Sequence, residues 1–118
     1  MNTIRVKRIA SGLQREISDI IANDIRDKDL QMVTVTFVKL ASDLSYAKVY
    51  VTTVFDDKKE KIITDLNNAK GFIRGELGRR KFEIRSMPDL EFVYDESLAY
   101  ADNIEKIIKN IHNEKKQD

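Results

Sequence analysis

The spacing of apolar residues along this chain changes from a helical period to a period of two and back again, which restricts the folds open to it. Between residues 2 and 24, apolar residues such as Val6, Leu13 and Ile17 recur at steps of three and four, which predicts an amphipathic helix. The stretch MVTVTFVKL then alternates and is rich in β-branched residues, which predicts a strand. The fold must therefore combine helices with a sheet.

A β-hairpin is predicted for residues 32–54. The turn-forming letters SDLS at 42–45 separate the first alternating run from a second, YAKVYVTTV. In the first run, alternation places Val33, Val35 and Phe37 on one side and Thr34, Thr36 and Val38 on the other. In the second run, Ala47, Val49 and Val51 are predicted to face inward and Tyr46, Lys48, Tyr50 and Thr52 outward.

The second half of the chain is predicted to add helices and one more strand. A helical stripe runs from Asp57 through Ile62, Leu66, Ala69, Ile73 and Leu77, and Met87-Pro88 ends this part. LEFVYD is a short alternating strand, and Ser97 is a candidate N-cap for a last helix packed through Ile104, Ile107, Ile108 and Ile111. With residues 24–29 as a charged connector, the order is α–β–β–α–α–β–α, with helices on at least one face of a three-stranded sheet.

Length and composition indicate one domain. A chain of 118 residues buries roughly two-thirds of its unfolded surface around a single core. The absence of cysteine excludes a disulfide framework, a thiolate metal site and a cysteine nucleophile. The sequence has no signal-peptide pattern and no apolar run of membrane-spanning length, so we expect a cytoplasmic protein with no membrane partner.

Charge is separated along the chain although the net charge is only +1. Residues 1–15 carry four bases and no acid, and residues 70–86 carry six bases against two acids. Residues 89–105 carry acids and no base. This separation favours a polyanion as the partner of the basic part, although two merely solvated faces explain the pattern equally well.

No catalytic or metal-binding pattern is present. The one histidine, His112, lies near the end of the chain without a nucleophile implied beside it. The run GFIRGELG lacks the ending of a phosphate-binding loop and does not follow a strand. We therefore expect a binding protein and not an enzyme, with no cofactor, no metal and no small-molecule substrate.

The stretch DLNNAKGFIRGELGRRK, residues 65–81, combines glycines with bases on one predicted helix. On a helical wheel Lys70, Arg74 and Lys81 share one stripe, and Gly71, Gly75 and Gly78 lie on the adjoining face. Missing side chains beside a basic stripe let a phosphate backbone or another polypeptide approach the helix closely. The alternative is that one glycine breaks the segment into two helices and the others pack against a neighbour.

Three stretches together resemble one known family. RVKRIASGLQREISDII, VTVTFVKLASDLSYAKVYV and NNAKGFIRGELGRRKFEIRSMPDLEFVYDES are similar in order and spacing to bacterial ribosome-binding factor A, over about residues 4–108. The resemblance implies an α+β, type II KH-like fold, with a three-stranded mixed sheet and helices packed on one face. Residues 2–112 would form this single domain, with 113–118 as a frayed polar tail.

The same resemblance implies a kink in place of the usual KH nucleic-acid loop. In the family an Ala-x-Gly kink replaces Gly-x-x-G, and Ala69-Lys70-Gly71 matches it here. Gly71 would then permit the bend between two helices.

The function implied by the resemblance is assistance to ribosome assembly. The protein would bind the free small (30S) ribosomal subunit through 16S rRNA, as a monomer, and support late maturation, 16S rRNA processing and growth in the cold. A general KH-type RNA-binding module and a protein–protein adaptor using the acidic residues at 89–105 are the alternatives. The candidate RNA-binding residues are Lys70, Arg74, Lys81, Arg79, Arg80, Arg85, Arg5, Lys7 and Arg8.

Overall fold

The computed structural model describes residues 3–54, 56–80, 82 and 84–96. The predicted last helix after Ser97 and the polar tail at 113–118 lie outside these residues. Within the described part, none of the helices combines the length and the apolar character needed to cross a lipid bilayer.

The first helix, α1 (Thr3–Asn23), confirms the prediction for residues 2–24. Its apolar stripe is buried, and the opposite side carries exposed charged residues such as Arg8 and Arg15. An amphipathic helix gains most of its stability from packing this stripe and not from its intrinsic propensity. The buried residues are Ile9, Leu13, Ile17, Ile20 and Ile21.

The connector after α1 contains a short helix that the sequence analysis missed. Helix α2 (Lys28–Gln31) begins after Asp27, whose carboxylate accepts hydrogen bonds from the main-chain N–H groups of Asp29 and Leu30. Such capping satisfies donors that a helix start leaves unpaired. Leu30 is thereby brought into the core.

The sheet has three strands in the order β1-β2-β3. Strands β1 (Val33–Leu40) and β2 (Tyr46–Thr53) form the predicted antiparallel hairpin, and β3 (Asp89–Tyr94) pairs with β2 in parallel. Alternation in β2 is as predicted, with Ala47, Val49 and Val51 buried. The sheet is therefore mixed, as the resemblance implied.

The predicted sides of β1 are wrong after Thr36. A β-bulge lies between Val35 and Phe37, because Val35 pairs with Val51 and Phe37 with Tyr50. The extra residue moves all later side chains to the other face. Phe37 is consequently 55% exposed and Val38 is buried.

Side chains from both sides of the sheet hold the bulge. From α1, the Gln14 side-chain amide lies 3.3 Å from the carbonyl oxygen of Val35 and 3.4 Å from that of Thr36, and donates to both. From the end of β3, the Asp95 carboxylate accepts a hydrogen bond of 2.6 Å from the Thr36 hydroxyl. The bulge is therefore tied to both α1 and β3.

Two helices join β2 to β3. A short 3-10 turn, η1 (Asp56–Lys58), precedes α3 (Lys59–Asn68), and α4 (Lys70–Gly78) follows it. The break between them falls at Ala69, which has φ −89° and ψ 0°. The helical segment is thus interrupted at the position predicted for the kink.

Gly71 does not have the conformational role expected of it. It lies inside α4, and none of the described glycines has a positive φ. A Cβ atom placed on Gly71 would have no neighbour within 4 Å, the helix's own nearby main chain apart. The bend therefore does not require a glycine at this position.

We expect Gly71→Ala to stabilise the protein by up to about 1 kcal/mol, because alanine is the better helix former and the space for its Cβ is open. Urea denaturation of the variant and the wild type measures the difference. A loss of stability on Gly71→Ala would mean that the glycine is needed for the break.

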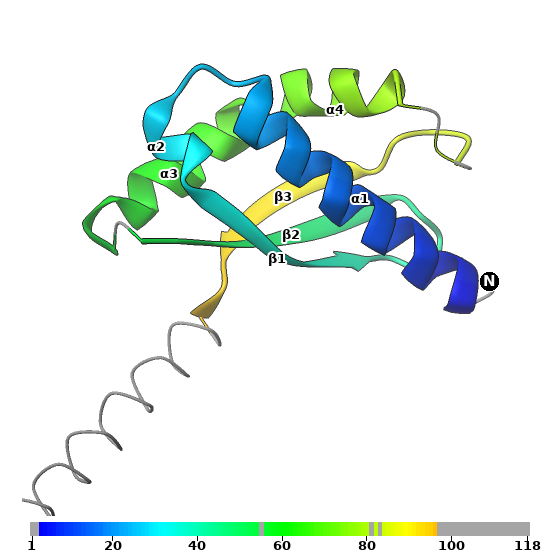
Figure 1. Ribbon diagram of the computed structural model, residues 1–118. Coiled ribbons are helices and arrows are strands. Elements are labelled where there is room, and N and C mark those ends of the chain that lie inside the picture. The colour runs from blue at the N-terminus through cyan, green and yellow to red at the C-terminus, as the bar shows by residue number, and fades with distance from the viewer. Residues whose placement is uncertain (1–2, 55, 81, 83, 97–118) are drawn as a thin grey trace, which may run out of the picture.

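The molecule has two layers, with α1, α3 and α4 on one face of the sheet (Figure 1). The core lies between the layers, where Ile62, Leu66, Ile73, Leu77 and Phe92 are almost completely buried. Asn67 of α3 fastens β3 to the helices: its Nδ2 donates to the carbonyl oxygen of Phe92 (3.0 Å) and its Oδ1 accepts from the N–H of Phe92 (2.9 Å). The side chain thus pairs with an edge strand much as a neighbouring strand would.

Candidate nucleic-acid interface

A groove brings together three of the predicted RNA-binding residues from distant parts of the sequence. It has a volume of about 500 Å³, and Arg5 of α1, Arg74 of α4 and Arg85 of the segment before β3 line it. The β1–β2 turn closes one side. We call it the arginine groove, and its other lining residues are Asp43, Leu44, Ser45, Ile84, Ser86, Met87 and Asp89.

Arg74 holds the wall of this groove in place. Its Nε donates to the carbonyl oxygen of Pro88 (3.1 Å) and its Nη2 to that of Met87 (3.0 Å). Its Nη1 lies 3.8 Å from a carboxylate oxygen of Asp89. Arg74 therefore ties α4 to the start of β3, and less of its hydrogen-bonding capacity is left for a phosphate.

The turn on the other side is ordered by its own hydrogen bonds. Leu44 has a positive φ of 65°, and the Asp43 carboxylate accepts from both the N–H (3.1 Å) and the hydroxyl (2.7 Å) of Ser45. These bonds lower the pKa of Asp43 below its ordinary value, so the carboxylate is charged at neutral pH. The main-chain N–H of Asp89 donates to the carbonyl of Ser45 and connects the turn to β3.

The arginine groove thus carries both signs of charge. Asp43 and Asp89 face the same space as the three arginines. Arg85 and Ser86 are exposed, and Arg85 has no ion pair with any residue in the described part of the chain. A ligand that offers phosphate oxygens to Arg85 and hydrogen-bond donors to the carboxylates would satisfy both.

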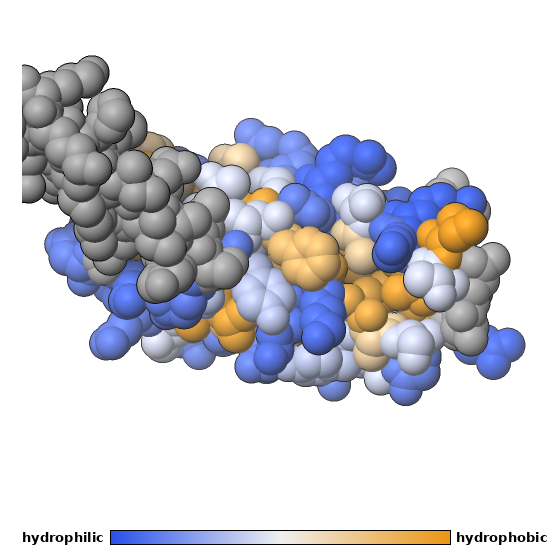
Figure 2. Space-filling view, turned by 90° about the horizontal axis from the view of Figure 1, so that it is seen from below, coloured by the Kyte–Doolittle hydropathy of each residue, from blue (hydrophilic) through white to orange (hydrophobic). Residues whose placement is uncertain are grey.

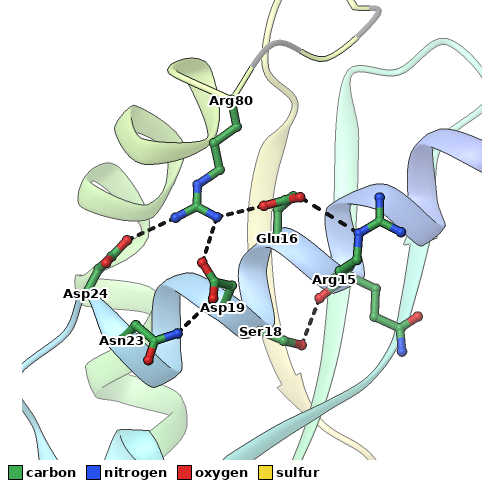
Figure 3. Close-up of polar contacts among 8 residues, drawn as sticks. Arg15, Glu16, Ser18, Asp19, Asn23, Asp24 and Arg80 are labelled. Atoms are coloured by element: carbon green, nitrogen blue, oxygen red, sulfur yellow. Dashed lines mark hydrogen bonds and ion pairs between the residues drawn. The ribbon is translucent and has the colours of Figure 1, made fainter.

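Arg80 is engaged within the protein and is not available as the sequence analysis expected. Its Nη1 contacts Glu16 (2.6 Å) and Asp19 (2.8 Å), and its Nη2 contacts Asp24 (3.1 Å), as Figure 3 shows. All three acids lie on or directly after α1, so Arg80 fixes the end of α4 to the first helix. The hydrogen bond from Arg80, followed by that from Asn23, lowers the pKa of Asp19, and the bonds to Asp19 and Glu16 raise the pKa of Arg80.

A second, smaller hollow of about 220 Å³ adjoins this cluster. Arg8 and Arg15 line it together with Arg80, Glu16 and Phe82. Arg15 is largely exposed, with its Nε 3.8 Å from Glu16. This hollow extends the basic surface of α1 beyond the arginine groove.

The remaining predicted residues are spread over the surface. Lys70 is exposed at the start of α4, and Arg79 at its end pairs with Glu76 at 3.0 Å. Lys7 lies on another side of α1, beside Phe37 and Lys39. Lys81 lies outside the described residues. The stripe predicted from the helical wheel is therefore divided, and the predicted residues meet in two places: Arg5, Arg74 and Arg85 in the arginine groove, and Arg8 and Arg80 in the smaller hollow.

Sequence reasoning missed the acidic and hydroxyl groups of the groove. The sequence analysis assigned Asp43 and Ser45 only to a turn between two strands. Nothing in the pattern indicated that this turn would lie beside Arg5 and Arg85. Their meeting depends on the parallel pairing of β3 with β2, which brings Asp89 opposite Tyr46.

Comparison with known proteins identifies the family. The family model described as Ribosome-binding factor A matches residues 5–108. The chain belongs to the ribosome-binding factor A family. Ribosome-binding factor A of Staphylococcus epidermidis is 42% identical over 113 residues, which are 95% of this chain and 97% of that protein.

Solved structures of the family share the fold. The crystal structure of ribosome-binding factor A from Thermus thermophilus matches with a TM-score of 0.67 and 28% identity, over 75% of this chain and 94% of that one. A homology model of the Thermus thermophilus protein, fitted into a cryo-electron microscopy map of a complex with the 30S subunit, matches with a TM-score of 0.62 and 29% identity, over 74% and 91%. These relatives have a KH-like fold, so the predicted fold class is confirmed.

Proposed function

We propose that this protein binds the free small ribosomal subunit through 16S rRNA and supports its late maturation and 16S rRNA processing. The observation that carries the proposal is the family match over residues 5–108, and the relative fitted into a 30S complex supports it. The protein acts in the cytoplasm as a monomeric binding factor, without catalysis. Growth in the cold is the condition in which its loss has the greatest effect.

The arginine groove is the proposed point of contact with rRNA. Backbone charge and shape dominate the recognition of RNA helices, so exposed guanidinium groups are sufficient without a base-reading pocket. Arg85 supplies an exposed guanidinium, the half-buried Arg5 lines the groove from the first helix, and Arg74 holds its wall. Lys70, Lys7, Arg8 and Arg79 extend the basic surface, and we assign Lys81 to it by its place in the sequence.

A sucrose gradient of a cell extract tests the proposed partner. We expect the protein to sediment with free small subunits and not with large subunits or assembled ribosomes. Equal distribution over all RNA-containing fractions would favour a general RNA-binding module, and absence from every ribosomal fraction would favour a protein adaptor. Either result would overturn the proposal.

The double variant Arg5→Gln/Arg85→Gln tests the proposed surface. Removing two phosphate contacts should weaken binding to purified small subunits and reduce the slope of log K against log salt by up to about 2, at roughly 0.7–0.9 per contact. Fluorescence titrations at several salt concentrations measure both quantities. Arg26→Gln/Lys28→Gln removes the same charge from exposed positions beyond the other end of α1 and should bind normally. If the two double variants bind with equal affinity and equal salt slope, the arginine groove is not the contact with rRNA.

A further inference from the structure

The face of the sheet away from α1, α3 and α4 carries apolar side chains open to solvent. Phe37 is 55% exposed and Tyr46 38% exposed. The rings of Phe37 and Tyr50 lie 6.1 Å apart, and Val93 of β3 is half-buried on the same side. Figure 2 shows this outer face from below, with apolar side chains gathered between charged ones. The inward residues of the three strands, in contrast, are already buried under the helices.

The chain leaves the described fold at this outer face. After β3, Asp95 donates its N–H to the Val51 carbonyl, and its side chain reaches Thr36, next to Phe37. In Figure 1 the last described residues descend from the sheet on the side opposite the helices. The described part of the chain therefore ends with Asp95 and Glu96 at this face, where Asp95 contacts the residue before Phe37.

The sequence that follows has a matching apolar stripe. Tyr100, Ile104, Ile107, Ile108 and Ile111 recur at helical spacing, so a helix over 97–112 would carry them on one side. Sixteen helical residues span about 24 Å. Strand β2, with 8 residues, spans about 26 Å, so the stripe and the sheet face have similar lengths.

We propose that residues 97–112 form a helix that docks on the outer face of the sheet and covers Phe37, Tyr46 and Tyr50. Its flanking carboxylate Glu105 complements Lys39 and Lys48, which border the aromatic rings on β1 and β2. The segment is tethered beside the face, so its effective concentration there is in the millimolar range, which favours it over a second copy or an RNA strand. The helix would give the sheet a third layer.

A spin label tests this docking, because the natural chain has no cysteine to compete for it. In Asn103→Cys carrying a nitroxide, the amide signals of Phe37 and Tyr50 should lose most of their intensity relative to the reduced label. Those of Ile73 in α4, behind the sheet, should keep theirs. Adding Ile104→Asp and Ile108→Asp should restore the lost intensity, because each change places a charge in the apolar stripe that would pack against the sheet.

The matched control adds the same charge to the opposite side of the predicted helix. Ala99→Asp with Asn110→Asp should leave the broadening intact. No broadening, or broadening that survives the isoleucine changes, would overturn the proposal. Broadening that disappears on dilution and reappears between mixed labelled and unlabelled chains would assign the face to a second copy. Shifts of these signals on adding oligouridine, without broadening by the label, would assign it to RNA.

Discussion

The Asn67→Ala variant is expected to lose about 1–3 kcal/mol of unfolding free energy, the cost of leaving buried main-chain groups without partners. Asn67 is the side chain that satisfies both the N–H and the carbonyl of Phe92 on the edge strand β3. Phe92 is 1% exposed, so water cannot readily replace the amide. Urea denaturation of the variant and the wild type measures the loss, and the two proteins should have the same m-value.

Asn68→Ala is the matched control, since Asn68 is the next residue of α3 and is exposed. It should change stability by no more than about 0.5 kcal/mol. Asn67→Asp should have a lower free energy of unfolding than the wild type, because a carboxylate accepts from the Phe92 N–H but cannot donate to the Phe92 carbonyl. Equal stability of Asn67→Ala and Asn68→Ala would show that the two hydrogen bonds contribute nothing.

Arg80→Gln is expected to lower the melting temperature at pH 7 clearly more than Arg79→Gln. Without the guanidinium, the carboxylates of Glu16, Asp19 and Asp24 face one another without their cation. Arg79 is largely exposed, and its one ion pair within the described part of the chain is with Glu76 in the last turns of α4, a contact of small value. Arg80→Glu, which adds a fourth acid, should be the least stable of the three variants.

The difference between wild type and Arg80→Gln should depend on pH. The pKa of Asp19 is lower in the folded state than its ordinary 3.8, so its contribution is complete above about pH 4 and is lost as the pH falls through the lowered value. The wild type loses this contribution in acid, and the variant lacks it at every pH. The melting temperatures of the wild type and of Arg80→Gln, measured from pH 7 to pH 2, should therefore converge as the pH falls. A constant gap would show that the ion pairs do not stabilise the fold.

Regular elements could be predicted because each has its own local signal. The stripe of α1, the alternation of β2 and the break near Ala69 all follow from residues close together in the sequence. Phe37 was placed on the wrong side because the bulge is held by Gln14 and Asp95, which are distant in sequence. Helix α2 is too short to show a period, and only its cap, Asp27, could have indicated it.

The candidate site could be predicted only in part, for a related reason. Charge counts located the basic segments and hence Arg5 and Arg85. They could not distinguish a base that faces solvent from one that faces the protein. Arg74 and Arg80 have the same chemistry as Arg85, but the carbonyls of Met87 and Pro88 and the acids of α1 engage them. Which arginines remain for a ligand is decided by tertiary contacts.

The bulge at Thr36 divides β1 into two parts that differ in which positions face the core. Upstream of it the odd-numbered Val35 is buried, and downstream the even-numbered Val38 and Leu40 are buried. Deleting Thr36 would restore a regular ladder in which Val35 still pairs with Val51 and Phe37 with Tyr50, so Phe37 would stay on the outer face and Val38 in the core. A relative that lacks Thr36 can therefore keep the same core on a regularly alternating strand, and what it gives up is the hydrogen bond that ties Thr36 to Asp95.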